Sequence, residues 1–209
     1  MTDRHSTPGR EKTRPGSPTT IGAIVLAAGF SRRFGAIKLN ARLPHGGTVF
    51  ESSLNNTSQA FDEIIVVGRR ELDDIGTYSA ALNRTESCRL LFCDDADRGM
   101  GHSLACAAHA IPNHWRACFV FLADMPFIHP DTLRQLQQQV TDESLIVPCW
   151  RGQRGHPTGF GRKYFDALRQ CSGDSGARHL LRDSTAITVI DVDDPGIVQD
   201  IDTPADLPH

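Results

Sequence analysis

The sequence lacks any long hydrophobic run. Its longest uninterrupted apolar stretch covers residues 117–123, which is far too short to span a bilayer. Basic residues are not in excess either, since the formal net charge is −3, and this balance argues against nucleic acid as a partner. The first 20 residues have no apolar core of the kind found in secretory signals. We therefore expect neither a membrane nor a nucleic acid among the partners.

The six cysteines lack the spacing of a metal or redox site. They stand at positions 88, 93, 106, 118, 149 and 171, and no pair fits Cys-x-x-Cys, so neither a zinc site nor a thioredoxin-like motif is expected. Several lie in apolar segments, where a free thiol behaves as a small core residue. This usage predicts a reducing, cytoplasmic environment without a disulfide framework.

Several common catalytic patterns are also missing. No segment fits GxxxxGK[ST], which excludes a Walker-type phosphate loop, and no GxGxxG follows a strand. Residues 29–33 begin like GxSxG but have no second glycine, and the nine histidines show no HExxH pattern. The chemistry must therefore be sought in other segments.

The composition is that of an ordinary globular domain. The chain has 209 residues, of which 39% are hydrophobic and 22% charged, and this is enough for one sizeable core. Residues 1–20 are rich in Pro, Gly, Ser, Thr and charge, and we expect them to form a disordered tail. A single domain over residues 21–209 remains.

Apolar runs alternate with helix-like segments throughout this domain. The pattern predicts strands at 21–26, 63–67, 89–93, 117–122, 145–147 and 186–192, and helices at 48–60, 71–82, 100–111, from 130 onward, at 163–168 and at 177–181. Such alternation indicates an α/β fold with a doubly wound parallel sheet. Ligands of these sheets bind beyond the carboxyl ends of the strands, so the loop 27–38, Asp124 and the segment 94–103 are expected near one crevice.

The loop over residues 26–38 is the most informative segment. It follows a buried strand and presents small residues, two glycines and three cations in that order. Glycine and alanine let backbone N–H groups come close to phosphate oxygens, and Arg33 and Lys38 can neutralise the charge that grows when a P–O bond breaks. The alternative is an ordinary turn with exposed basic residues.

Acidic residues at two strand exits are candidate metal ligands. Asp124 follows the most apolar strand and precedes Pro126, and a carboxylate there can hold Mg²⁺ together with substrate phosphates. A turn-forming aspartate is the alternative. A partner carboxylate is available late in the chain at Asp202, which could instead be a helix N-cap.

Three further segments are weaker signals. Residues 98–103 open a helix with two glycines, whose exposed N–H groups can meet a base edge or a phosphate. Residues 154–157 combine a cation and an imidazole on a constrained turn, and a plain surface turn explains them equally well. In residues 173–178 an early helical arginine could bind an anion or close a local salt bridge.

These segments together resemble a known family. Leu26-Ala27-Ala28-Gly29-x-Ser31-x-Arg33-x-Gly35-x-x-Lys38 is similar to the signature loop of the MobA-like NTP transferases, which have a single Rossmann-like, mostly parallel sheet of the nucleotide-diphospho-sugar transferase type. Asp124-Met125-Pro126 resembles the metal-binding segment of that family. The segments 154–157, 173–178 and 200–207 are similar to the molybdenum cofactor cytidylyltransferase branch. The resemblance covers residues 21–207.

The resemblance implies Mg²⁺-dependent transfer of CMP from CTP to molybdopterin, with release of pyrophosphate. It makes Arg33 and Lys38 catalytic and Asp124 and Asp202 the metal ligands. It assigns the pterin substrate to Arg154 and His156. Nucleotide binding falls to the loop and to the start of the helix at 100, at residues Leu26, Ala27, Ala28, Gly29, Ser31, Gly99, Met100 and Ser103.

Other functions remain open at this point. Nucleotidyl transfer could use GTP or take a sugar phosphate as acceptor, and a non-catalytic carrier could hand molybdopterin to a molybdenum hydroxylase apo-enzyme. The chain also departs from the cytidylyltransferase branch in one place. That branch often has an asparagine before the Gly-Met pair, where this chain has Cys-Asp-Asp-Ala-Asp at residues 93–97.

Overall fold

The computed structural model describes residues 20–31, 33–85, 88–183 and 186–208. The tail expected at residues 1–20 thus lies outside the described residues, apart from Thr20, which is already the first residue of a strand. No helix in the described ranges has the length and apolar character needed to cross a membrane. All six cysteines are free thiols.

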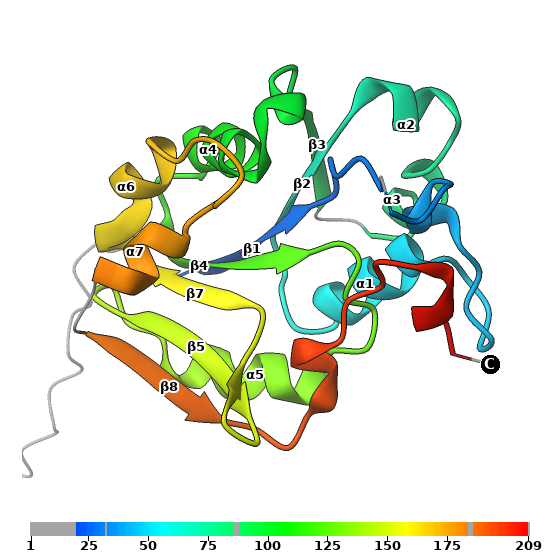
Figure 1. Cartoon of the computed structure of the whole chain (residues 1–209). Helices are drawn as coiled ribbons and strands as arrows, with labels where there is room; N and C mark the ends of the chain where they lie inside the picture. Colours follow the sequence, from blue (N-terminus) through cyan, green and yellow to red (C-terminus); the bar gives the residue numbers. More distant parts are fainter. Residues whose placement is uncertain (1–19, 32, 86–87, 184–185, 209) are drawn as a thin grey trace, which may run out of the picture.

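One mixed, mostly parallel sheet forms the centre of the molecule (Figure 1). The strand order is β3-β2-β1-β4-β7-β5, with β8 beside β5 and the short β6 pairing with the end of β5. Strand β7 is antiparallel to both of its neighbours, and the pairs β1–β2, β2–β3, β1–β4 and β5–β8 are parallel. The α/β, mostly parallel architecture is confirmed. The strands are β1 (Thr20–Leu26), β2 (Ile64–Gly68), β3 (Cys88–Phe92), β4 (Trp115–Leu122), β5 (Leu145–Trp150), β6 (Gln153–Arg154), β7 (Thr158–Gly161) and β8 (Ile187–Asp191).

Helices cover both faces of this sheet (Figure 1). One face carries α1 (Val49–Ser58), α2 (Arg70–Asp74), α3 (Ser79–Leu82) and α5 (Pro130–Gln139). The other carries α4 (Met100–His109), α6 (Phe165–Arg169) and α7 (Arg178–Asp183). Short 3₁₀ turns occupy Lys38–Asn40, Ala96–Arg98, Arg162–Tyr164, Pro195–Val198 and Pro204–Asp206.

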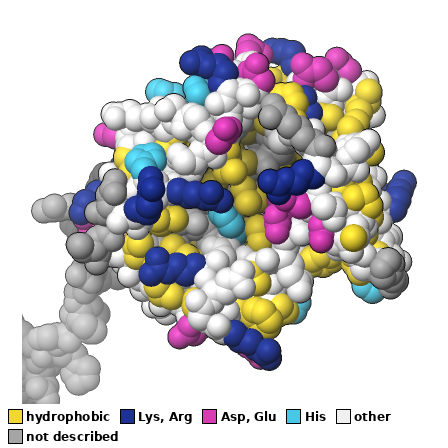
Figure 2. Space-filling view, viewed as in Figure 1, with side chains coloured by type: hydrophobic (Ala, Val, Ile, Leu, Met, Phe, Trp, Pro, Cys, Tyr) yellow, Lys and Arg dark blue, Asp and Glu magenta, His cyan; other side chains and the backbone are white. Residues whose placement is uncertain are grey.

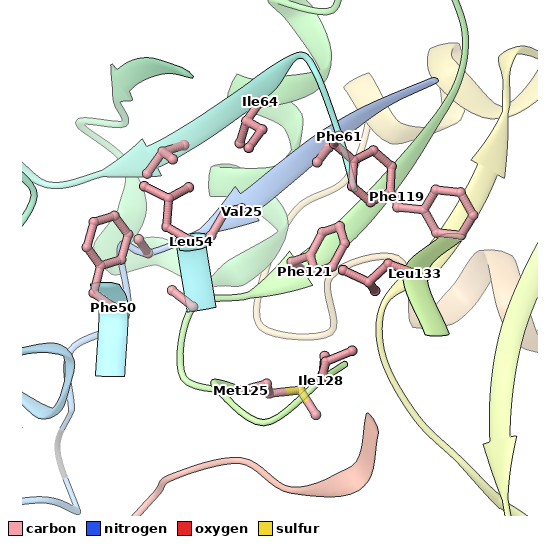
Figure 3. Close-up of a cluster of buried hydrophobic side chains, with 14 of the residues drawn as sticks. Val25, Phe50, Leu54, Phe61, Ile64, Phe119, Phe121, Met125, Ile128 and Leu133 are labelled. Atoms are coloured by element: carbon pink, nitrogen blue, oxygen red, sulfur yellow. The ribbon is translucent and has the colours of Figure 1, made fainter. Parts of the chain in front are cut away.

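The period-two alternation of the strands divides the core into two layers. In β1, Ala23 and Val25 face the α1 and α5 side, whereas Ile24 and Leu26 face the α4 and α6 side. The α1 side is rich in aromatic rings (Figure 3), and the ring centroid of Phe61 lies 5.5 Å from that of Phe121. Both faces of the sheet are therefore apolar, and polar side chains at strand ends are left to build a site.

One expectation about secondary structure was wrong, and one strand of the sheet was not predicted. The predicted helix 71–82 is instead two short helices, α2 and α3. Gly76, which lies between them, adopts φ +77° and interrupts the helix. Ile75, expected on the buried face, is 57% exposed at that break. Strand β7 was not predicted, since its sequence Thr-Gly-Phe-Gly is short and half glycine.

Candidate active site

The segments expected near one crevice do meet at the carboxyl ends of β1, β3 and β4. They enclose a cavity of about 390 Å³. Predicted residues that line it are Leu26, Ala28, Gly29, Ser31, Arg33, Lys38, Gly99, Met100, Ser103, Asp124 and Asp202. Sequence reasoning had not singled out five further lining residues, which are Phe30, Ala96, Asp97, Leu122 and Asp174.

The loop after β1 is shaped by two residues with positive φ. Ser31 has φ +49° and Gly35 has φ +74°, and a glycine adopts this conformation without the steric penalty of a side chain. The Ser31 hydroxyl accepts a hydrogen bond from the backbone N–H of Lys38 at 3.3 Å, which closes the loop. Leu39 is buried directly after Lys38 and anchors that end. Lys38 is thus held at the far end of the loop.

The base of the loop is fixed by a buried tyrosine. The hydroxyl of Tyr78 donates to the carbonyl oxygen of Ala27 at 3.0 Å and accepts from the backbone N–H of Arg69 at 3.1 Å. Burial raises the pKa of Tyr78 to about 12, so the hydroxyl stays protonated and keeps both bonds. Ala27 itself is buried and does not line the cavity, and its contribution is to hold the loop in place rather than to form the cavity wall.

Phe30 gives the cavity an aromatic rim. Its side chain is 41% exposed, and the guanidinium carbon of Arg69 lies 3.9 Å from the centre of its ring. Stacking of a cation on an aromatic face is attractive. The ring is therefore held at the entrance of the cavity by a residue that directly follows β2.

Two cations and two carboxylates meet on one wall of the cavity. The Nζ of Lys38 lies 2.5 Å from Oδ2 of Asp124 and 3.1 Å from Oδ1 of Asp202, and Nη1 of Arg33 lies 2.8 Å from Oδ2 of Asp202. Burial favours a lower pKa for Lys38, but the attraction of the two carboxylates outweighs it and the pKa is raised. The hydrogen bond from Lys38 is the main reason that the pKa of Asp202 is lowered. Lys38 and Asp202 are therefore both charged at neutral pH.

A backbone hydrogen bond holds the segment that carries Asp202 beside Asp124. The backbone N–H of Ile201 donates to the carbonyl oxygen of Asp124 at 2.9 Å. The N-cap of the following 3₁₀ turn is Thr203, which forms a capping box with Asp206. The alternative of Asp202 as an N-cap is therefore wrong, and its side chain lines the cavity instead, paired with Lys38 and Arg33.

The acidic wall has the donor set of a divalent metal site. Asp124, Asp200 and Asp202 each offer a carboxylate oxygen, and these three oxygens lie within 4.8 Å of one another. The Oδ1 atom of Asp124 is buried and has no hydrogen-bond partner among the described residues. Mg²⁺ prefers such oxygen ligands, so these residues fit the ion. Asp200 had not been singled out, because nothing in the run of aspartates distinguished it.

The start of α4 forms another side of the cavity. Gly99 has φ +116°, and a Cβ at this position would come within 2.4 Å of the Gly173 backbone. The N–H of Gly101 donates to the carbonyl oxygen of Gly173 at 2.7 Å. The glycines therefore allow the 172–174 loop to pack against the helix, and this contact brings Asp174 to the cavity.

A second cavity adjoins the first. It measures about 270 Å³ and shares Leu26, Met100 and Leu122 with the first cavity. Arg154 and His156, which were predicted to bind substrate, line this second cavity and not the first. Figure 2 shows this face of the molecule hollowed at its centre, with hydrophobic side chains on the floor and Lys or Arg side chains on both sides.

The second cavity combines apolar walls with cationic groups. Arg178 lines it together with Arg154. The His156 Nδ1 is buried without a hydrogen-bond partner within the described part of the chain, and burial lowers the pKa of this histidine. Its imidazole is therefore neutral at pH 7. A cavity of this kind suits a partly apolar molecule that carries anionic groups.

The sheet, the glycine-containing loop with its cations, and the facing carboxylates together define a nucleotidyltransferase. The sequence model of the MobA-like NTP transferase domain matches residues 23–188, and the chain belongs to this family.

Known proteins support the same assignment. The chain is 34% identical to purine catabolism protein PucB of Bacillus subtilis (strain 168), over 90% of this chain and 94% of PucB. It is 25% identical to a probable molybdenum cofactor guanylyltransferase of Methanosarcina acetivorans, over 70% of this chain and 64% of that protein. Among solved structures, Rv0371c of Mycobacterium tuberculosis H37Rv matches with a TM-score of 0.72 and 25% identity, covering 91% and 96% of the two chains. A complex of Rv0371C with manganese matches with a TM-score of 0.69.

Proposed function

We propose that this protein transfers the CMP group of CTP to molybdopterin, with Mg²⁺ as its metal and pyrophosphate as the second product. We assign the nucleotide to the first cavity and call it the nucleotide-side cavity. One observation carries the proposal: this cavity and the second cavity share a wall of three residues, Leu26, Met100 and Leu122. A donor nucleotide and an acceptor can therefore lie side by side. The similarity to a molybdenum cofactor guanylyltransferase supports molybdopterin as the acceptor.

The reaction needs no protein nucleophile. The terminal phosphate of the acceptor is already ionised at neutral pH, and its oxygen attacks the α-phosphorus of CTP. A new O–P bond forms, the bond to the bridging oxygen breaks, and pyrophosphate leaves with the electron pair. Catalysis then consists of alignment and charge neutralisation. Lys38 and Arg33 line the cavity and supply that positive charge.

Each wall of the nucleotide-side cavity has a separate task in this proposal. The backbone of Ala28, Gly29 and Ser31 cradles the triphosphate, while Gly99, Met100 and Ser103 surround the base. Asp124 and Asp202 hold Mg²⁺, with Asp200 as a further oxygen donor within reach. When bound, the ion neutralises phosphate charge and orients the leaving pyrophosphate.

CTP is favoured over GTP by the loop sequence. The run Ala27-Ala28-Gly29 resembles the cytidylyl rather than the guanylyl enzymes, although one relative is named a guanylyltransferase. At 100 times its dissociation constant, a ligand that binds only the folded state adds about 2.7 kcal/mol of stability. We expect CTP with Mg²⁺ to raise the melting temperature by about 5 °C or more, and UTP and ATP to raise it less. If GTP protects better than CTP, the donor assignment changes while nucleotidyl transfer stands.

Arg154 tests the acceptor side separately. We expect Arg154→Ala to raise the KM for molybdopterin by about tenfold or more, since a charge-assisted bond to an anionic group is lost, and to leave nucleotide protection unchanged. Arg151→Ala is the matched control, because Arg151 is exposed, stacks on Trp150 and does not line the second cavity. An unchanged KM in the Arg154 variant would remove this residue from the acceptor site.

The product would then pass to a molybdenum hydroxylase apo-enzyme. The competing proposal is a non-catalytic carrier. Pyrophosphate release distinguishes the two, because a carrier binds molybdopterin without releasing pyrophosphate. The pairing of a cation-bearing loop with facing carboxylates favours the enzyme, because binding a pterin alone requires neither.

A further inference from the structure

Two carboxylates of the acidic wall, those of Asp124 and Asp202, are occupied by cationic side chains rather than left open for a metal. The ammonium group of Lys38 bridges Asp124 and Asp202, and Arg33 contacts the remaining oxygen of Asp202. Three of the four oxygens on these two carboxylates are thus engaged by cations. The fourth, Oδ1 of Asp124, is buried without a partner among the described residues.

We propose that Lys38 competes with the metal in the nucleotide-free protein, and that the triphosphate draws it away, so that the divalent ion binds tightly only together with the nucleotide. This inference rests on the proposed function, since it assumes that a metal and a triphosphate share this cavity. It assigns Lys38 two positions: on the carboxylates at rest and on the phosphates when the substrate is bound.

Charge balance supports the exchange. Asp124, Asp200 and Asp202 contribute three negative charges, and Lys38 and Arg33 offset two of them. A divalent ion that joins the carboxylates while Lys38 remains there would lie a few ångströms from an ammonium group in a partly buried site, where like charges repel strongly. A triphosphate supplies several negative charges at once, and these can accept Lys38 and Arg33 while the carboxylates accept the ion.

The local structure allows Lys38 to move without unfolding the loop. Its backbone is held by the Ser31 hydroxyl and by the buried neighbour Leu39, so the motion is confined to the side chain. Lysine has a flexible four-carbon stem and a compact charge. Both Lys38 and the loop residues Ala28, Gly29 and Ser31 line the same cavity, so a triphosphate cradled by the loop lies within the same space.

The test is metal binding without nucleotide, with Mn²⁺ as the probe and the free ion measured by electron paramagnetic resonance. We expect Lys38→Met to bind Mn²⁺ about tenfold more tightly than the wild type or better, because the competing cation is gone. Lys38→Arg should show no gain, since it keeps the charge. Lys163→Met is the matched control, because Lys163 pairs with Glu143 on the surface. Equal or weaker Mn²⁺ binding by Lys38→Met would overturn the proposal.

Stability provides a second readout if removal of Lys38 weakens the fold. Mn²⁺ should raise the melting temperature of Lys38→Met more than that of the wild type, because the ion then fills the place of the missing cation. A smaller or equal rise contradicts the exchange. Neither measurement contains CTP or molybdopterin, so their failure leaves nucleotidyl transfer intact, whereas failure of all four nucleotides to protect the wild type would remove the proposed function itself.

Discussion

Lys38→Ala lowers the turnover number by about 10²-fold or more. The Lys38 side chain is 12% exposed, lines the cavity and pairs with both Asp124 and Asp202. In a water-poor site, a fixed charge beside the reacting phosphorus stabilises the transition state more strongly than it would in bulk water. The proposed reaction uses no general base or protein nucleophile, so we expect charge neutralisation to carry a large share of the rate. Steady-state pyrophosphate release with saturating CTP, Mg²⁺ and molybdopterin measures this effect.

Two controls separate chemistry from folding in this experiment. The melting temperature of Lys38→Ala without ligand shows whether the variant is folded. Lys163→Ala removes a lysine whose partner, Glu143, lies on the surface, and it should retain wild-type turnover. A rate for Lys38→Ala within a few-fold of the wild type would remove Lys38 from the reaction.

Asp124→Asn is the second substitution with a large expected effect. We expect activity at physiological Mg²⁺ to fall by about 10²-fold, and the Mg²⁺ concentration for half-maximal rate to rise by about tenfold. The neutral amide keeps the shape of the side chain but removes one negative charge from the three-carboxylate group. Excess Mg²⁺ should restore part of the rate, and a Mg²⁺ titration of pyrophosphate release measures both changes.

The matched control for this variant is Asp131→Asn. Asp131 is an exposed aspartate whose partner Arg134 lies one helical turn away in α5, and surface pairs of this kind contribute little. Its Mg²⁺ titration should coincide with that of the wild type. If the titration of Asp124→Asn coincides with them as well, Asp124 is not a metal ligand.

Hydrophobic patterning was enough to predict most of the fold. The six predicted strands all exist. Central runs such as residues 117–121 are buried in the sheet, whereas β3 and β8 are only partly buried. Strand β7 escaped prediction because half of its residues are glycine, and its place in the sheet depends partly on pairing with β4, which is distant in sequence. The break at Gly76 depends on a positive φ that a lone glycine permits but does not require.

For the site as well, features set by local sequence were predictable and features set by long-range packing were not. Asp124 and the loop 26–38 directly follow predicted strands. Their approach was predictable because the carboxyl ends of parallel strands lie at the same edge of a sheet. Asp174 and Asp200 reach the site through contacts between distant segments, the first through the packing of Gly99 and Gly101 on the 172–174 loop. The separation of two cavities was not predictable either. Arg154 and His156 line the second cavity, because of a backbone geometry that no local sequence pattern specifies.

The most direct test of the proposed reaction is pyrophosphate release by the purified protein, measured with CTP and molybdopterin together and with each alone. The proposal predicts pyrophosphate only when Mg²⁺ and both substrates are present, in an amount equal to a product whose mass is that of molybdopterin joined to CMP. No pyrophosphate with any of the four nucleotides, despite bound molybdopterin, would contradict it and favour a carrier.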